Sequence, residues 1–194
     1  MSNAVQPVSQ KIIIPEARLA FADRIFEAKP FQGEGKATYG CTLLLPENAP
    51  ILATIIAEEN RVAKEKWGAK ADASMLVIRA NNRQALKPGA LKANFDGFPG
   101  NFFISCTGDK RPTVVNRDKT PLTAADGVIY SGCYVLAHVS LWAQDNNWGQ
   151  RINAELTGLQ FLRDGDAFSG GAAPSAVDDF ADLGAGEDAA DLMS

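Results

Sequence analysis

The sequence predicts a mainly β protein with one α-helix, long loops and a loose acidic tail. Three observations lead to this fold class. Most apolar segments alternate with a period of two, one segment repeats with a helical period, and the last 31 residues carry eight acidic and no basic side chains. With 194 residues and 46% hydrophobic content, the chain can form one domain with its own core.

Strands are expected where short apolar or alternating runs are bounded by Gly, Pro or Asn. Pro15 interrupts the first run, which indicates a kinked or edge strand. In the second run, Cys41, Leu43 and Leu45 share one face, and Pro46 ends it. The expected strands are Lys11–Ile14 with Ala17–Phe21, Ala37–Leu45, Met75–Arg79, Asn101–Thr107, Tyr130–Trp142 and Arg151–Phe161.

The single helix is expected from Asn48 to Trp67, because its apolar residues recur at helical spacing. Pro50 suits the first turn, with Asn48 or Ala49 as the cap, and Gly68 ends the run. Two loops rich in Gly, Pro and polar residues are expected at 81–100 and 108–127. Long loops in compact domains are often functional.

Charge divides the chain into two parts. The whole chain has a net charge of −4, which argues against a polyanionic ligand. Residues 1–163, however, hold all 19 Lys and Arg residues against 15 acidic residues, a net charge of +4. We therefore expect a folded domain over residues 1–168 and a disordered acidic tail over residues 169–194, where few apolar side chains could offset the ordering entropy.

The cysteines and the N-terminus indicate a reducing compartment. Three widely spaced cysteines form no CxxC motif, so neither a disulfide framework nor a structural zinc site is expected. Residues 1–11 lack the pattern of a secretory signal, and no stretch is apolar enough to span a bilayer. A cytoplasmic protein without a membrane partner is expected.

Catalytic signals are weak. His138 is the only histidine and lies inside an alternating strand, where a structural role is the commoner one. No phosphate-binding glycine loop is present. Five loop aspartates could gather magnesium, but their spacing is equally typical of solvated turns: Asp96, Asp109, Asp118, Asp126 and Asp145. We expect no enzyme activity, no cofactor and no metal.

Aromatic side chains favour a binding function. In the segment from Tyr130 to Trp142, the odd positions from Cys133 to Leu141 form an unbroken apolar face directed at the core. The other face carries Tyr130, Tyr134 and Trp142, and Phe103 has similar polar neighbours on its own strand. Exposed rings on a barrel can stack unpaired bases. The alternative is that these rings pack beneath the helix or the loops.

Basic residues gather beside these rings in two clusters. Such clusters are usually solvated surface, but phosphate attraction next to stacking rings is the combination that binds single strands without sequence preference. The expected phosphate contacts are Arg79, Arg83, Lys87 and Lys92 in the first cluster, and Lys110, Arg111, Arg117 and Lys119 in the second.

Five blocks of this sequence resemble a family of bacteriophage single-stranded DNA-binding proteins, distantly similar to the replication binding protein of T7-like phages. The blocks occur in the same order and span residues 11–168. They are YGCTLLLP (Tyr39–Pro46), KEKWG (Lys64–Gly68), KRPTVV (Lys110–Val115), IYSGCYVLAHVSLWAQDN (Ile129–Asn146) and LTGLQFLRDGDAF (Leu156–Phe168). The resemblance implies an OB-fold barrel of about five strands, and binding of single-stranded DNA during phage replication, recombination or repair in the bacterial cytoplasm.

The acidic tail is expected to compete with DNA for the basic surface or to bind replication proteins of phage or host. A purely solubilising tail is the alternative, and the absence of a terminal aromatic residue puts an aromatic-anchored contact in doubt. The tail residues concerned are Asp178, Asp179, Phe180, Asp182, Glu187, Asp188 and Asp191. Two rival functions stay open, a protein-interaction or virion component and a metal-dependent nuclease, as does formation of a homo-oligomer.

Overall fold

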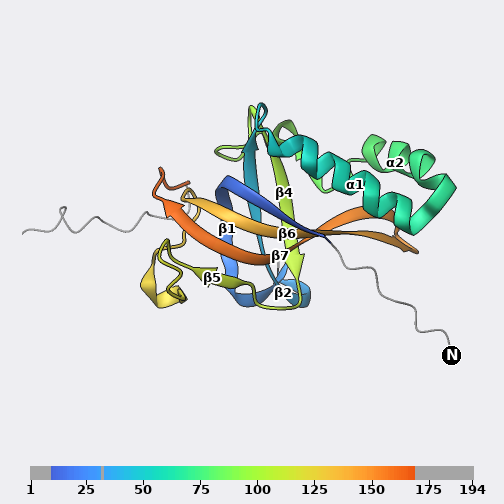
Figure 1. Ribbon diagram of the computed structural model, residues 1–194. Coiled ribbons are helices and arrows are strands. Elements are labelled where there is room, and N and C mark those ends of the chain that lie inside the picture. The colour runs from blue at the N-terminus through green and yellow to red at the C-terminus, as the bar shows by residue number, and fades with distance from the viewer. Residues whose placement is uncertain (1–9, 32, 169–194) are drawn as a thin grey trace, which may run out of the picture.

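The computed structural model describes residues 10–31 and 33–168, in which five long strands close into a barrel (Figure 1). Neighbouring strands are antiparallel in the order β4-β2-β1-β6-β7, and a parallel pairing between Cys106 and Ala154 joins β4 to β7. This closed barrel confirms the expected mainly β, OB-fold architecture. The five strands are β1 (Lys11–Phe31), β2 (Glu34–Pro46), β4 (Asn101–Gly108), β6 (Tyr134–Asn146) and β7 (Gly149–Arg163).

Each of the two expected long loops contains a short strand. Strand β3 (Leu86–Pro88) pairs with β4, and β5 (Thr113–Val115) runs parallel to β7. Single turns of 3-10 helix follow at Gly89–Lys92 and Ala124–Asp126. These pairings fix both loops against the barrel.

Strand β1 is much longer than the two short runs expected from the sequence. It continues through Pro15, where its pairing with β6 shifts register between Ile14 and Ala17. Its pairing with β2 shifts again between Ala20 and Arg24. Such bulges bend a strand and allow it to wrap around a small barrel. They also interrupt the alternation that would have shown the strand in the sequence.

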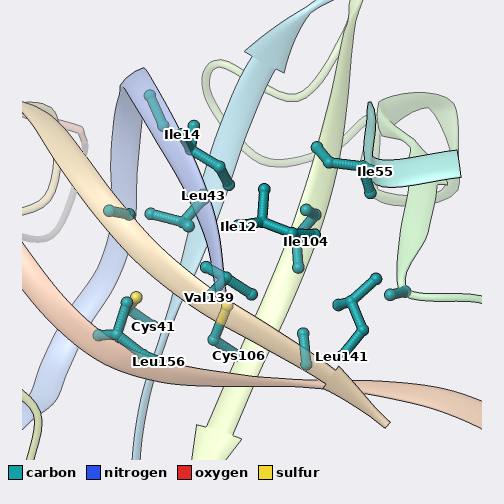
Figure 2. Packing of buried hydrophobic residues seen from close by; sticks show 14 of the residues in the cluster. Ile12, Ile14, Cys41, Leu43, Ile55, Ile104, Cys106, Val139, Leu141 and Leu156 are labelled. Atoms are coloured by element: carbon teal, nitrogen blue, oxygen red, sulfur yellow. The ribbon is translucent and has the colours of Figure 1, made fainter. Parts of the chain in front are cut away.

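The barrel interior is apolar, as the period of two predicts. The side chains of Ile12, Ile14, Leu43 and Ile104 converge from β1, β2 and β4 (Figure 2). The predicted inward face is confirmed, because the odd positions from Cys133, just before β6, to Leu141 are at most 1% exposed. Strand β6 itself begins at Tyr134 and extends to Asn146, so Tyr130 precedes it.

Helix α1 (Ile51–Trp67) confirms the expected helix and packs Ile55 and Val62 against the core. Its N-cap is Pro50 rather than Asn48 or Ala49. Figure 1 shows α1 and the second helix, α2 (Ala71–Ala80), together on one flank of the barrel. Neither helix in the described part of the chain has the length and apolar content needed to cross a membrane.

The strand expected at Met75–Arg79 is wrong, because these residues lie in α2 (Ala71–Ala80). Ala71, Met75 and Ile78 are buried, and their spacing marks one face of a helix. The intervening Leu76 and Val77 are 72% and 60% exposed. A short continuous apolar run does not distinguish a strand from a helix. The described chain therefore contains two α-helices, not one.

Burial protects all three cysteines. Desolvation raises the pKa of Cys41 to about 12 and that of Cys133 to about 11, and it also raises the pKa of Cys106. At pH 8 the thiolate fraction of Cys41 and Cys133 is then on the order of 10⁻³ or less, and the thiolate is the reactive form. We expect the native protein to react with Ellman's reagent only slowly, and the denatured protein to release three equivalents at once. A rapid stoichiometric reaction in the native state would contradict this burial.

Candidate nucleic-acid interface

A groove of about 510 Å³ lies on the outer face of the barrel, where β1, β2 and β4 run side by side. Thr42 of β2 pairs with Ser105 of β4 and with Ala20 of β1. The hydroxyl oxygens of Thr42 and Ser105 lie 3.3 Å apart. Together with Thr107, these small uncharged side chains form a low polar floor on which a flat ligand can lie.

Two exposed phenylalanines form one wall of this groove. Phe21 of β1 is 39% exposed and Phe95, in the loop after β3, is 42% exposed. Their ring centroids lie 5.3 Å apart with the ring planes nearly perpendicular, at 84°. We call this pair the aromatic ridge. It presents apolar ring faces and edges to solvent beside a polar floor, which is the environment that a nucleobase requires.

Two buried phenylalanines support the aromatic ridge from below. Phe98 is 1% exposed and its ring lies 5.8 Å from that of Phe21 and 6.0 Å from that of Phe95. Phe103 of β4 is 2% exposed and lies 5.3 Å from Phe98 in an edge-on arrangement. With Ala20 and Leu44 they form a small apolar cluster outside the barrel core. The loop is therefore packed onto the barrel.

The backbone at Phe21 is strained. Its φ angle is +53°, in the left-handed region that L-residues other than Asn, Asp and His rarely adopt. The strain falls at the β1 bulge between Ala20 and Arg24. Non-glycine residues held in this region cost about 1–3 kcal/mol and are often found at functional sites.

Lys92 brings positive charge to the aromatic ridge. Its Nζ atom lies 5.1 Å from the ring centroids of both Phe21 and Phe103, and 5.5 Å from that of Phe98. Burial lowers the pKa of Lys92 below its usual value. A partly desolvated ammonium over ring faces is held in place by cation–π attraction and can still reach a phosphate at the groove.

The loop that carries Lys92 is fixed at its start. The Glu59 carboxylate of α1 accepts a hydrogen bond from the Leu86 backbone N–H at 2.8 Å. Burial raises the pKa of Glu59. Gly89 allows the loop to turn tightly, because a Cβ atom there would lie 1.7 Å from the Phe98 carbonyl oxygen. Lys87 of β3 lies nearby, with its pKa lowered by burial and then by Lys92 and Arg151.

Arg24 supplies a second cation to the groove. Its Nη1 atom donates to the Thr38 hydroxyl at 3.1 Å. The guanidinium lies over Gly40, where a Cβ atom would come within 3.1 Å of Arg24 Nη2 and 2.5 Å of the Cys106 carbonyl oxygen. Glycine at this position therefore leaves room for the arginine side chain.

Of the four rings predicted to stack bases, the structure leaves one well exposed. Trp142 is 45% exposed on the outer face of β6. Phe103 is covered by Phe98 and Lys92, so it supports the aromatic ridge rather than presenting a free face. Tyr130 is 9% exposed, and its hydroxyl donates to Asp164 and Gly165 and accepts from the Gly165 N–H.

Two arginine side chains lie over the Tyr134 ring. The Arg163 guanidinium carbon lies 3.5 Å from its ring centroid and that of Arg18 lies 5.8 Å away. Tyr134 and Trp142 lie toward opposite ends of β6, outside the groove. The predicted set of four rings therefore does not form one surface.

The first predicted basic cluster is divided by the structure. Lys92 lines the groove and Lys87 lies 6.0 Å from the Phe103 ring beneath it. Arg79 donates to the Asn60 side chain at 2.9 Å and lies 3.9 Å from Glu59. Arg83 donates to the Trp148 carbonyl oxygen at 2.7 Å. Of these four residues, Lys92 therefore lines the groove, Lys87 lies near a ring that supports it, and the other two contact the helices and the β6–β7 turn.

The second predicted cluster is also spread out. Lys110 is exposed, and Arg111 lies over the ring of Phe26 in β1 at 5.7 Å. Arg117 and Lys119 are exposed in a turn that packs against β7, because the Gln160 side chain donates to the carbonyls of Asn116 and Arg117. The acidic tail residues lie outside the described residues.

Sequence reasoning missed Phe21, Arg24 and Phe95. Phe21 reads as the last residue of a short apolar strand, and Arg24 falls in the part of β1 that was not expected to be a strand. Phe95 carried a usable signal, since an aromatic residue between Asn94 and Asp96 in a Gly/Pro-rich loop is expected at the surface.

Most of the aspartates considered as magnesium ligands hold local structure instead. Asp109 pairs with Lys36, and Asp118 and Asp126 accept backbone N–H groups within their own turns. Asp145 accepts from Trp67 and Gln150, which lowers its pKa. Within residues 10–31 and 33–168, no three His, Cys, Asp or Glu side chains come together as a metal site would require.

Comparison with known proteins gives two matches by sequence. A family model described as the ssDNA-binding protein of Enterobacter phage Enc34 matches residues 10–193. Protein p50 of Acyrthosiphon pisum secondary endosymbiont phage 1 is 40% identical over 181 residues, which cover 92% of this chain and 96% of that protein.

Solved structures show the same fold. The single-stranded DNA-binding protein from bacteriophage Enc34, in complex with ssDNA, matches 79% of this chain and 86% of its own with a TM-score of 0.67 and 22% identity. Its C-terminally truncated form matches 81% and 88% of the two chains with a TM-score of 0.67 and 25% identity. The single-stranded DNA-binding protein gp2.5 of bacteriophage T7 matches 90% and 94% with a TM-score of 0.55 and 15% identity.

Proposed function

Since the chain belongs to the family of the ssDNA-binding protein of Enterobacter phage Enc34, we propose that it binds single-stranded DNA without altering it chemically. The observation that carries this proposal is the groove itself. It combines two exposed rings, Phe21 and Phe95, with the cations Arg24 and Lys92 above an uncharged floor. Base stacking and phosphate attraction are both available there, and neither depends on base identity.

In this proposal the strand crosses β1, β2 and β4 on their outer face. Bases stack against the aromatic ridge, and phosphates lie toward Lys92 and Arg24. Lys87, Lys110 and Arg111 remain proposed phosphate contacts at the margins. Trp142 stays a candidate for a longer path along β6. Arg79, Arg83, Arg117 and Lys119 lie away from the groove, so we assign them smaller contributions.

A titration with labelled oligonucleotides tests this function. We expect the full chain to bind a single strand more tightly than the matching duplex, because stacked and paired bases cannot reach the aromatic ridge. If three or four cations engage phosphates, the logarithm of the affinity should fall with the logarithm of the salt concentration with a slope of about −2 to −3. The oligonucleotide should stay intact with magnesium present.

Four results would count against the proposal. An affinity that does not depend on salt would contradict the proposed phosphate contacts. Equal affinity for single strand and duplex would contradict the proposed base stacking. Magnesium-dependent loss of the oligonucleotide would favour the nuclease alternative. Absence of any shift at low salt would favour a protein-interaction or virion component.

We further propose that the protein acts in phage DNA replication, recombination or repair, and that its acidic tail competes with DNA for the groove. Removing residues 170–194 is expected to tighten single-strand binding by about 3- to 10-fold at low salt, and the difference should vanish at high salt, where charges are screened. A full-length variant with the six tail acids from Asp178 to Asp191 changed to Asn or Gln should match the truncation. Weaker binding after truncation would show that the tail contributes contacts instead.

A further inference from the structure

A second hollow lies on the other side of the aromatic ridge. Its volume is about 290 Å³, and it shares Phe21, Phe95 and Asp23 with the groove. This size is near the lower end of the roughly 300–1,000 Å³ typical of small-molecule sites. A hollow of this size suits one flat ring system, and its position next to the groove puts it within reach of a strand lying there.

The two sides of the aromatic ridge differ in chemistry. The groove is lined by Arg24 and Lys92, whereas the residues that line the hollow include no Lys or Arg. The polar side chains of the hollow are Asp23, Asn94, Asp96 and Ser131, and its apolar walls include Phe98 and Phe168. Asp23 lines both cavities, but only the groove has cations to offset the repulsion between a carboxylate and a phosphate. The hollow therefore suits a base rather than the backbone of a strand.

Four separate segments build the hollow, namely β1, the loop after β3, Ser131 and Phe168, and contacts between them hold its shape. The Ala22 N–H of β1 donates to the Ser131 hydroxyl at 3.1 Å, and the Phe168 N–H donates to the Ser131 carbonyl oxygen at 3.0 Å. The Arg18 guanidinium lies over the far wall, 4.3 Å from the Phe168 ring centroid. Gly97 leaves room for this ring, because a Cβ atom there would lie 2.6 Å from Phe168 Cζ.

The hydrogen-bonding groups of the hollow favour some bases over others. An ionised carboxylate only accepts hydrogen bonds, and it can accept two parallel N–H donors at once. Guanine offers two such donors side by side, N1–H and the N2 amino group. Thymine offers a single N3–H between two carbonyl oxygens, which a carboxylate repels. Asp23 therefore suits guanine better than thymine.

We propose that this hollow is a base pocket that receives one nucleobase of the bound strand and prefers guanine. The inference rests on the proposed function, because the base reaches the pocket only from a strand in the groove. Phe21 and Phe95 then separate the pocketed base from the phosphates near Lys92. Binding stays tolerant of sequence overall, with a preference at one nucleotide position.

The test compares oligonucleotides that differ at one position. Full-length protein is titrated with a labelled thymidine 15-mer and with the same oligomer carrying one central guanine, hypoxanthine or adenine. We expect the guanine oligomer to bind about fivefold more tightly than the all-thymidine oligomer, at the lower end of what a bidentate base contact gives. Hypoxanthine, which lacks the N2 amino group, should lose most of this gain.

Variants then assign the preference to the pocket. Asp23→Ala should bring the guanine-to-thymine affinity ratio close to one. Asp72→Ala, at an exposed acid of α2, should leave that ratio unchanged. The ratio is the relevant quantity because removing any acid strengthens binding to all DNA.

Each alternative outcome has a distinct meaning. Tight binding of the thymidine oligomer with no gain for guanine would overturn the base pocket and leave the proposed function intact. A guanine preference that survives Asp23→Ala would also overturn it. No binding of any oligomer would overturn the proposed function together with the pocket.

Discussion

Replacing Lys92 by Glu is expected to weaken single-stranded DNA binding by roughly 10- to 100-fold at low salt. The Lys92 ammonium is held above Phe21 and Phe103, so a carboxylate there would lose the attraction to the rings and repel the phosphates. Fluorescence anisotropy over a series of salt concentrations should also show a shallower slope of log affinity against log salt concentration. The slope should decrease by about 0.7 for each lost phosphate contact on a single strand.

Two further variants separate position from charge. Lys92→Arg keeps the positive charge, so the salt dependence of binding should stay that of the natural protein. Arg117→Glu makes the same change of charge in the turn that packs against β7, and its effect should be several times smaller than that of Lys92→Glu. If Arg117→Glu were the more damaging variant, the strand would have to cross the β5–β7 side of the barrel.

Replacing Phe98 by Ala is expected to lower the free energy of unfolding by about 3–5 kcal/mol. The Phe98 side chain is 1% exposed and packs with Ala20, Leu44 and Phe103 from three barrel strands, so its removal leaves a cavity between the loop and the barrel. In a chain of this size each kcal/mol shifts the melting temperature by about 2–4 °C, so we expect a decrease of roughly 6–20 °C. Calorimetry and urea titration measure both quantities.

Phe95→Ala is the matched control on the same loop. Its ring is 42% exposed, so stability should change by less than about 1 kcal/mol, while single-strand affinity should fall by about 1–3 kcal/mol through lost stacking. If Phe98→Ala had the same melting temperature as the natural protein, the loop would not unfold together with the barrel. An unchanged affinity of Phe95→Ala would remove this ring from the binding surface.

Much of the barrel was predictable because the side chains of a strand alternate between faces. The inward faces of β2 and β6 follow directly from that period, and the stripe on α1 follows from the helical period. The secondary-structure prediction failed where the periodic segment is short or interrupted. Residues 75–79 are too few to distinguish a helix from a strand, and the bulges of β1 hide its full length.

The candidate site was predictable in composition but not in place. Basic loops and aromatic rings were expected, and Lys92 does lie at the groove. The alternation of side chains along a strand shows that a ring points away from the core. It does not show which residues then cover that ring. Phe103 points outward and is covered by Phe98, and Tyr130 is used in hydrogen bonds to Asp164 and Gly165.

The sequence by itself determined that this protein has a mainly β domain, a mildly basic body and an acidic tail, because periodicity and charge are local properties of the chain. Only the tertiary structure decided which cations and rings share a surface. Phe21, Lys92, Phe95 and Ser105 meet there because a bulge in β1 and the packing of Phe98 join segments that are far apart in the sequence. Such meetings depend on strand register and loop packing, which no local pattern encodes.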